Sequence, residues 1–288
     1  EKFKDYDERL HYEIHNLFRY NHRLVSGQLS IFVPFLYEEL LAGGPERSFL
    51  SKATVQAAVD KLRGMDYSLF YREFLYMNKD LGIEKEYKMA EVLPDIILFP
   101  TMGSKSILWQ DISCRRRDTP GRFLFPMFAE VSVEDLMIRV CGRYRWELCR
   151  TVQGANWNNI QIKSLTSEYC DYIQYYRKNH DLSEEKREKL KAQIQKAKGS
   201  TKETFVQDYE VWMKYESGGA VRLNKVAREL LATYCPFGTA VRNALRSQPI
   251  FEDAMGRFER GRTKKAYELE LRYRMLEKEK GELPEELT

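Results

Sequence analysis

The segment from Lys105 to Arg150 holds the densest group of side chains that could bind an anion. Nine basic residues occur in it, eight of them arginines, and aromatic residues are interleaved with them. Guanidinium groups pair bidentately with phosphate or carboxylate, and aromatic rings offer stacking surface. We therefore predict a binding site for an anionic ligand, a nucleotide or nucleic acid. The predicted ligand-binding residues are Lys105, Trp109, Arg115, Arg116, Arg117, Arg122, Arg143, Arg145 and Trp146.

The alternative for these arginines is internal ion pairing. The same segment contains the acidic residues Asp111, Asp118, Glu130, Glu134, Asp135 and Glu147. If the arginines pair with these carboxylates, they stabilise the fold instead of binding a ligand. The two interpretations predict different surfaces, because only the first leaves guanidinium groups converging on a cavity.

Histidines offer the first candidate for a metal site. His11, His15 and His22 lie at spacings that place them along one face of a helix. A pair four residues apart can bind a metal, but the run from His11 to His15 lacks the glutamate that follows the first histidine in HExxH helices. His22 lies about 10 Å further along the axis, too far to bind the same ion. We predict packing or surface histidines, with no metal and no cofactor.

Other catalytic signatures are incomplete. Gly103-Ser-Lys-Ser106 lacks the first glycine of a phosphate-binding P-loop, although it could form a looser anion-binding turn. Pro94-Asp95 could begin the core of a metal-dependent nuclease, and Asp111 supplies a second acid, but the lysine two residues after that acid is missing. Asp208, Glu210 and Glu216 have no ExxH partner, so we interpret them as helix-surface acids. An enzyme whose active site is assembled from distant residues remains an alternative.

Composition sets the class of protein. The chain has 288 residues, of which 43% are hydrophobic and 31% charged, with a net charge of +4. No apolar run reaches the roughly 18 residues of a membrane span. The five cysteines are odd in number and form no CxxC pair, which argues against a disulfide framework or a zinc finger. We expect a soluble cytoplasmic protein with reduced thiols.

Helical periodicity and capping signals dominate the chain. Apolar spacing predicts helices over about 3–25, 28–41, 51–63, 66–78 and 83–92. Further helices are predicted over about 132–151, 165–179, 184–198, 201–216, 221–234, 238–247 and 249–280. Ser51, Ser132 and Ser200 stand where N-caps are expected, and Ser200 begins a capping-box pattern with Glu203.

The stretch 94–128 has a different pattern. Short apolar runs at 96–99, 107–109 and 122–125 are separated by glycines and prolines, which predicts strands or extended loops. Elsewhere, a D-Y-x-x-[FY]-Y-R pattern occurs at 66–72 and again at 171–177. The recurrence indicates either two related helical hairpins or chance similarity between tyrosine-rich helices.

The fold we predict is mainly α, an irregular multi-helix bundle with a small β or loop insertion near 94–128. It forms a single helical body over 1–288, or two lobes, 1–153 and 160–288. The predicted function is a non-enzymatic binding or regulatory module for an anionic ligand. The second hypothesis is a helical protein–protein scaffold that binds its partner through the charged C-terminal helix 255–280, since residues 222–274 carry 12 basic and 6 acidic side chains.

Overall fold

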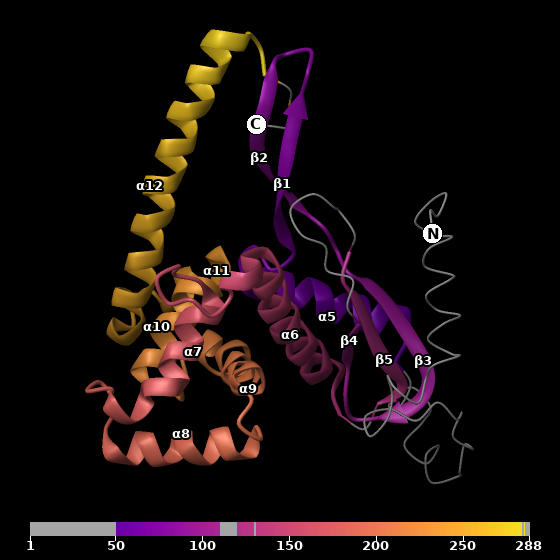
Figure 1. Ribbon diagram of the computed structural model, residues 1–288. Coiled ribbons are helices and arrows are strands. Elements are labelled where there is room, and N and C mark those ends of the chain that lie inside the picture. Colours follow the sequence, from indigo (N-terminus) through magenta and orange to yellow (C-terminus); the bar gives the residue numbers. More distant parts are fainter. Residues whose placement is uncertain (1–49, 110–119, 130, 284, 286–288) are drawn as a thin grey trace.

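The computed structural model describes residues 50–109, 120–129, 131–283 and 285. Within these residues, eight α-helices and two small β-sheets form a mainly α fold, which confirms the predicted class (Figure 1). The helices are α5 (Lys52–Met65), α6 (Val133–Gln153), α7 (Leu165–Tyr175), α8 (Glu184–Lys196), α9 (Thr201–Lys214), α10 (Lys225–Tyr234), α11 (Thr239–Leu245) and α12 (Pro249–Lys280). The predicted helices over 3–25 and 28–41, with their three histidines, lie outside the described residues.

The serine caps begin the helices that they were predicted to begin. The side chain of Ser51 accepts a hydrogen bond from the backbone N–H of Thr54, and Ser132 accepts one from Asp135. Ser200 accepts one from Glu203. Each bond satisfies one of the N–H groups that the first helical turn leaves without a partner.

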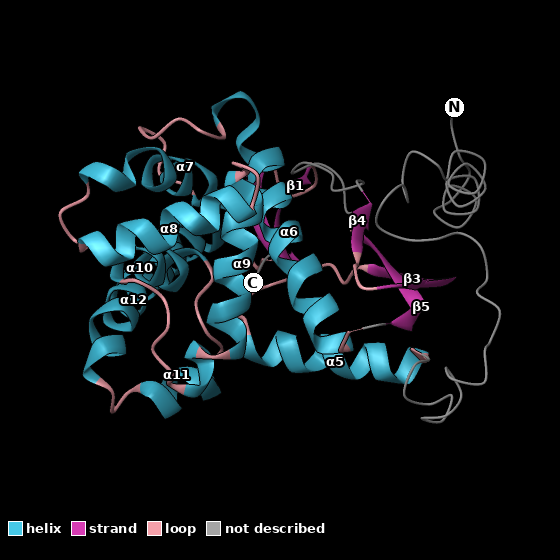
Figure 2. Ribbon diagram, turned by 90° about the horizontal axis from the view of Figure 1, so that it is seen from below, coloured by secondary structure: helices cyan, strands magenta, loops and turns pink. Residues whose placement is uncertain are grey.

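The predicted β insertion is a three-stranded sheet. It consists of β3 (Asp95–Gly103), β4 (Ile107–Trp109) and β5 (Arg122–Ala129) in the order β3-β5-β4. Strand β5 is parallel to β3 and antiparallel to β4. Seen from below, this sheet lies on one side of α5 and α6, and the later helices gather on the other side (Figure 2).

A second sheet corrects the prediction of helices over 66–78 and 83–92. The chain forms an antiparallel hairpin there, from β1 (Tyr71–Asn78) and β2 (Ile83–Glu91). Its turn is stabilised by the Asn78 side chain, which accepts from the backbone N–H groups of Asp80 and Leu81. Gly82 has φ +61°, a left-handed conformation that glycine adopts without strain. The aromatic residues of β1 favour a strand over a helix.

The hairpin also tests whether the two copies of the D-Y-x-x-[FY]-Y-R pattern have the same structure. Residues 66–72 form the turn after α5 and the start of β1, whereas residues 171–177 continue from α7 into a 3₁₀ turn. The two copies therefore adopt different structures. The structure excludes the alternative of two related helical hairpins, which leaves chance similarity between the two segments.

The core is built around α6. This helix packs against α5, α7 and α9. Its buried face includes Val140, Cys141, Tyr144 and Trp146, of which Trp146 is 3% exposed and the other three are fully buried. The ring of Trp146 contacts the rings of Trp157 from the turn after α6, Tyr169 from α7 and Phe205 from α9. Residues from both sides of Gly154 thus share one apolar core.

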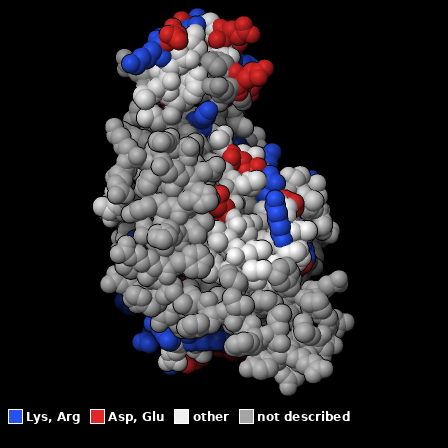
Figure 3. Space-filling model, turned by 90° about the vertical axis from the view of Figure 1, so that its right-hand side faces the viewer, with Lys and Arg blue, Asp and Glu red and all other residues white. Residues whose placement is uncertain are grey.

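The hairpin and the distal part of α12 extend together from this body as an arm, which we define as residues 71–91 and 258–283 (Figure 1). At its far end Tyr76 and Ile83 of the hairpin pack against Tyr273 and Leu283. On the face shown in Figure 3, charged side chains of both signs lie at this end of the molecule. Among the described residues, none of the helices is long and apolar enough to cross a membrane.

Candidate functional site

A basic pocket lies where the β insertion meets the turn between α8 and α9. The cavity has a volume of about 480 Å³. It is lined by Lys105, Ser106, Ile107 and Leu108 from the β3–β4 region, Arg143 from α6, and Lys196, Ala197, Lys198, Lys202, Glu203 and Gln207 from the α8–α9 region. We call this site the lysine pocket. Four lysines and one arginine accompany a single acidic residue among its lining side chains.

The α8–α9 turn brings three of the lysines to the pocket. Helix α8 ends at Lys196, and the chain then passes through two left-handed residues, Lys198 at φ +53° and Gly199 at φ +74°. The backbone N–H of Gly199 donates to the carbonyl of Ile194, which closes the turn. Ser200 then caps α9. The first turn of α9 therefore lies beside the lysines, where its N–H groups and the helix dipole favour an anion.

Arg143 connects the two halves of the pocket. Its Nε and Nη2 atoms donate to the Glu203 carboxylate at 3.2 and 3.0 Å, and its Nη1 donates to the carbonyl of Ser106 at 3.2 Å. Desolvation alone would raise the pKa of Glu203, but the hydrogen bonds and charge of Arg143, with the nearby Lys202 and Lys105, lower that pKa below its ordinary value. Glu203 is therefore ionised at neutral pH. It does not fold back onto Ser200 as the capping-box pattern suggested, because the Ser200 N–H donates to Ala197.

The remaining lysines differ in how they are paired. Lys202 lies 3.1 Å from the Glu147 carboxylate. Lys105, Lys196 and Lys198 are exposed, and none of them forms an ion pair with a carboxylate in the part of the chain that the structure describes. Within the described residues, the pocket thus contains three lysines that have no carboxylate partner.

The structure brings two of the sequence-predicted residues, Lys105 and Arg143, into this pocket. It places Arg122 and Arg145 elsewhere, each against an aspartate. Arg122 is fully buried, with its Nε atom 3.6 Å from the Asp95 carboxylate. Arg145 donates two hydrogen bonds to the fully buried Asp66.

The two predicted tryptophans also lie outside the pocket. Trp146 is buried in the aromatic core, and Trp109 packs beside Phe99 and Leu124 of the small sheet. Arg115, Arg116 and Arg117 lie outside the described residues. Sequence reasoning missed Lys196, Lys198 and Lys202. The run Lys-Ala-Lys-Gly-Ser-Thr-Lys just before a predicted helix start was the signal that could have found them.

A separate polar cluster surrounds Asp208 on α9. This side chain is 4% exposed and accepts hydrogen bonds from Tyr169 and from Gln193, the latter at 2.7 Å. Desolvation raises its pKa to about 6, although both hydrogen bonds oppose the shift. Within the described residues, histidine, cysteine and acidic side chains nowhere form a group of three or more that could hold a metal ion.

Comparison with known proteins gives a family match for the C-terminal part of the chain. A sequence-family profile described as a domain of unknown function (DUF8509) matches residues 154–288. No curated protein and no solved structure matches the chain. The matched range contains the lysines of the α8–α9 turn but neither Lys105 nor Arg143. The similarity names no activity.

Proposed function

We propose that this chain is a non-enzymatic binding and regulatory module that takes an anionic ligand, a nucleotide or nucleic acid, in the lysine pocket. The observation that carries the proposal is the convergence of Lys105, Lys196 and Lys198, none of them paired with a described carboxylate, on one cavity beside Arg143. Concentrated like charges repel one another, and a bound phosphate group relieves that repulsion.

The size and chemistry of the pocket support a phosphate-bearing ligand. A cavity of about 480 Å³ is in the range that small ligands and cofactors occupy. Arg143 offers a planar fork of donors, the lysines offer mobile charges, and the first turn of α9 offers backbone N–H groups. Glu203 holds Arg143 in place until a ligand competes for the guanidinium group.

The test is a binding titration with a fluorescein-labelled oligo(dT) of about 20 nucleotides and with labelled ATP. Anisotropy is measured at about 50 and 200 mM KCl for the wild type and for the double variant Lys196→Glu/Lys198→Glu. Because phosphate contacts release counterions, we expect wild-type affinity to fall steeply with salt. The double variant is expected to bind about tenfold or more weakly, and its salt slope should be smaller by about one for each lysine that no longer meets a phosphate.

The matched control is Lys189→Glu/Lys191→Glu, which makes the same charge change on α8 at two residues that do not belong to the lysine pocket as defined above. At about 200 mM KCl, where charges more than about 7 Å apart are largely screened, this variant is expected to bind within about twofold of the wild type. Equal affinity of the two double variants would contradict the proposal. So would the absence of binding to both probes at the lower salt concentration.

A second candidate function, a protein–protein interaction scaffold, is favoured by the arm. Residues 260–270 of α12 are all exposed. Several large apolar side chains on the helix are exposed, among them Tyr267 at 61% and Met275 at 64%. Exposed apolar groups gathered on one projecting element are typical of interaction surfaces. The test is affinity capture from extracts of the source cell with the wild type and with Tyr267→Ser/Leu271→Ser/Met275→Ser. Identical sets of captured proteins would contradict the scaffold function.

A further inference from the structure

Helix α12 contacts the rest of the molecule at two separated points along the arm. At the base, the Phe258 ring lies edge-on to Tyr67 with centroids 5.9 Å apart. Near the far end, Arg272 Nη2 donates to the Glu86 carboxylate of β2 at 2.6 Å. The two points are about 20 Å apart at 1.5 Å per residue. All residues from 260 to 270 are exposed, and within this interval the Arg262 guanidinium lies 5.9 Å from the centroid of the Tyr67 ring at the base.

One face of α12 is directed across this interval toward the hairpin. At 100° per residue, Phe258, Arg262, Lys265, Leu269 and Arg272 lie on the same side of the helix. Both ends of this row touch the base or the hairpin, so the middle of the row faces the same way. Yet Arg262 and Lys265 are exposed, and Leu269 is 42% exposed. The space between α12 and the hairpin is therefore open to solvent.

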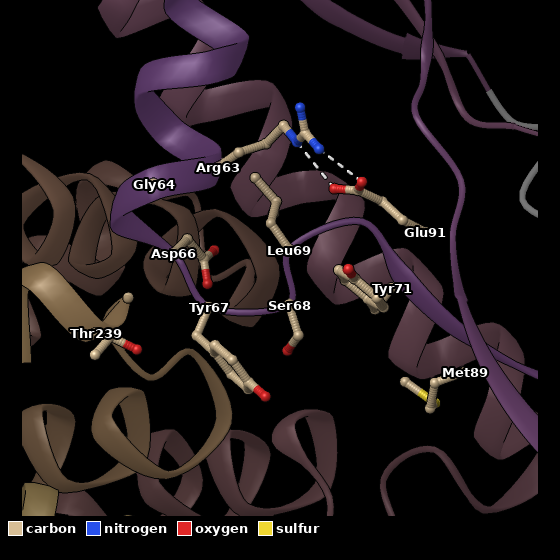
Figure 4. A pocket seen from close by; sticks show the side chains of 11 residues that line it. Arg63, Gly64, Asp66, Tyr67, Ser68, Leu69, Tyr71, Met89, Glu91 and Thr239 are labelled. Carbon is tan, nitrogen blue, oxygen red and sulfur yellow. Dashed lines mark hydrogen bonds and ion pairs between the residues drawn. The ribbon is translucent and has the colours of Figure 1, made fainter. Parts of the chain in front are cut away.

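A cavity of about 650 Å³ lies at the base of the arm. Figure 4 shows Tyr67 and Thr239 on one side of it, Tyr71 and Met89 on the other, and Ser68 between them. Tyr71 is 44% exposed and Met89 is 59% exposed. An apolar group of a partner could pack against large apolar side chains that line a cavity and remain this exposed.

The helix that borders the space is strongly basic. Between 260 and 274 the basic residues are Arg260, Arg262, Lys264, Lys265, Arg272 and Arg274, and the acidic ones are Glu268 and Glu270. Lys264 and Arg274 each approach one of these two acids. Arg262 and Lys265, which face the hairpin, have no carboxylate within ion-pair distance among the described residues. The charge of this face is complementary to an acidic occupant.

The aromatic groups distinguish a polypeptide from a nucleic acid. Bases of single strands bind by stacking on free aromatic faces. The Tyr67 ring is already covered, with the Arg242 and Arg262 guanidinium groups 5.6 and 5.9 Å from its centroid and Phe258 at its edge. Of the exposed side chains that remain, Tyr71 is aromatic, whereas Met89 and Leu269 are flexible and aliphatic. Methionine and leucine suit apolar side chains better than they suit bases.

We propose that the space between α12 and the hairpin binds an acidic polypeptide segment of a partner protein. One apolar side chain of that segment enters the cavity between Tyr67 on one side and Tyr71 and Met89 on the other, and its carboxylates lie against Arg262 and Lys265. The proposal rests on the scaffold function and specifies the chemistry of the partner.

The probe is a phage-displayed library of random peptides of about 16 residues, selected on the full chain and then measured by anisotropy as labelled peptides. We expect enrichment of sequences that combine Asp or Glu with Leu, Phe or Trp. Two variants test the contacts. Arg262→Glu/Lys265→Glu reverses the facing charges, and Met89→Lys places a charge in the cavity. Each is expected to weaken binding of the selected peptides about tenfold or more.

The control is Arg260→Glu/Lys264→Glu, which makes the same charge change on the opposite side of the same helix. It is expected to alter affinity less than about twofold. Thermal unfolding of each variant shows whether the arm remains folded, and a Met89→Leu variant, which keeps the cavity apolar, is expected to bind like the wild type.

Three results would overturn the proposal. They are a selection with no enriched peptides, a consensus without acidic residues, and equal affinity of the two charge-reversed variants for the selected peptides. Displacement of the peptides by oligo(dT) at equal strength in the wild type and in the lysine-pocket variant would assign the space to nucleic acid. The scaffold function is judged by the captured proteins alone, so it can survive a partner chemistry different from the one proposed.

Discussion

Removing Arg145 is expected to destabilise the protein severely, because Asp66 would lose its counter-charge inside the core. Asp66 is fully buried, and Arg145 Nε donates to its carboxylate at 2.7 Å while Nη2 donates a second hydrogen bond. Tyr209 supplies a third donor at 2.5 Å. In Arg145→Ala, the Tyr209 hydroxyl would be the side-chain donor left to the carboxylate among the described residues. Breaking a buried ion pair on one side costs about 3–5 kcal/mol.

That loss corresponds to a fall of roughly 6–20 °C in Tm for a chain of this size. Urea unfolding followed by far-ultraviolet circular dichroism measures it directly. The control Arg274→Ala removes an exposed arginine that pairs with Glu270 four residues away, and we expect a change below about 0.5 kcal/mol. Asp66→Asn/Arg145→Met, which neutralises both partners, should be more stable than Arg145→Ala. A loss in Arg145→Ala no larger than that in Arg274→Ala would refute this reasoning.

Further substitutions test separate features of the fold. Desolvation raises the pKa of Asp208 to about 6, above its ordinary value of 3.8, so the folded state holds a proton between these pH values that the unfolded chain releases. Lowering the pH from about 7 to about 5 should therefore stabilise the wild type by about 1 kcal/mol relative to Asp208→Asn. Urea titrations in which the free energy of unfolding changes equally with pH in both proteins would contradict this. Gly238→Ala should destabilise by more than about 2 kcal/mol, because a Cβ would lie 2.1 Å from the Gly64 carbonyl oxygen. In Gly64→Ala nothing lies within 4 Å of the new Cβ, so this variant should instead be more stable than the wild type by about 0.5–1 kcal/mol. Thermal unfolding measures both glycine variants, and a lower Tm in Gly64→Ala would contradict the helix argument.

Helix starts could be predicted from the sequence because their chemistry is local. Ser51, Ser132 and Ser200 each accept from a backbone N–H three residues later, so the cap and its partner lie in one short stretch. The strands of the three-stranded sheet were equally visible, because glycines and prolines separate their short apolar runs. These signals survive in a single sequence because they do not depend on distant residues.

The hairpin could not be predicted in the same way. Its tip is fixed by Tyr76 and Ile83, which pack against Tyr273 and Leu283 about 190 positions further along the chain. A run of aromatic and charged residues fits a helix or a strand when that contact is unknown, so tertiary packing decided the outcome. The length of these segments did not resolve the ambiguity, because strands of eight or nine residues are as long in sequence as short helices.

The arginine segment was recognised, but its partners were not. Sequence reasoning compared these arginines with nearby acids, and Arg150, which pairs with Glu147, follows that pattern. Arg143 pairs with Glu203 and Arg145 with Asp66, from elements 60 and 79 positions away. The lysines of the α8–α9 turn had a local signal in their run, but their position beside Lys105 depends on the fold.

The position of α6 links the two proposed binding regions. Arg143 and Arg145 are two residues apart and therefore lie about 200° apart around the helix. Arg143 is directed to the lysine pocket, where it contacts Ser106 and Glu203. Arg145 is directed to the base of the arm, where it contacts Asp66 and the carbonyl of Tyr67. Because one buried, well-packed helix holds both guanidinium groups, the two regions keep a fixed separation. On the two proposals made above, we therefore expect that a ligand in the lysine pocket and a partner on the arm bind at the same time, without a rearrangement of the core.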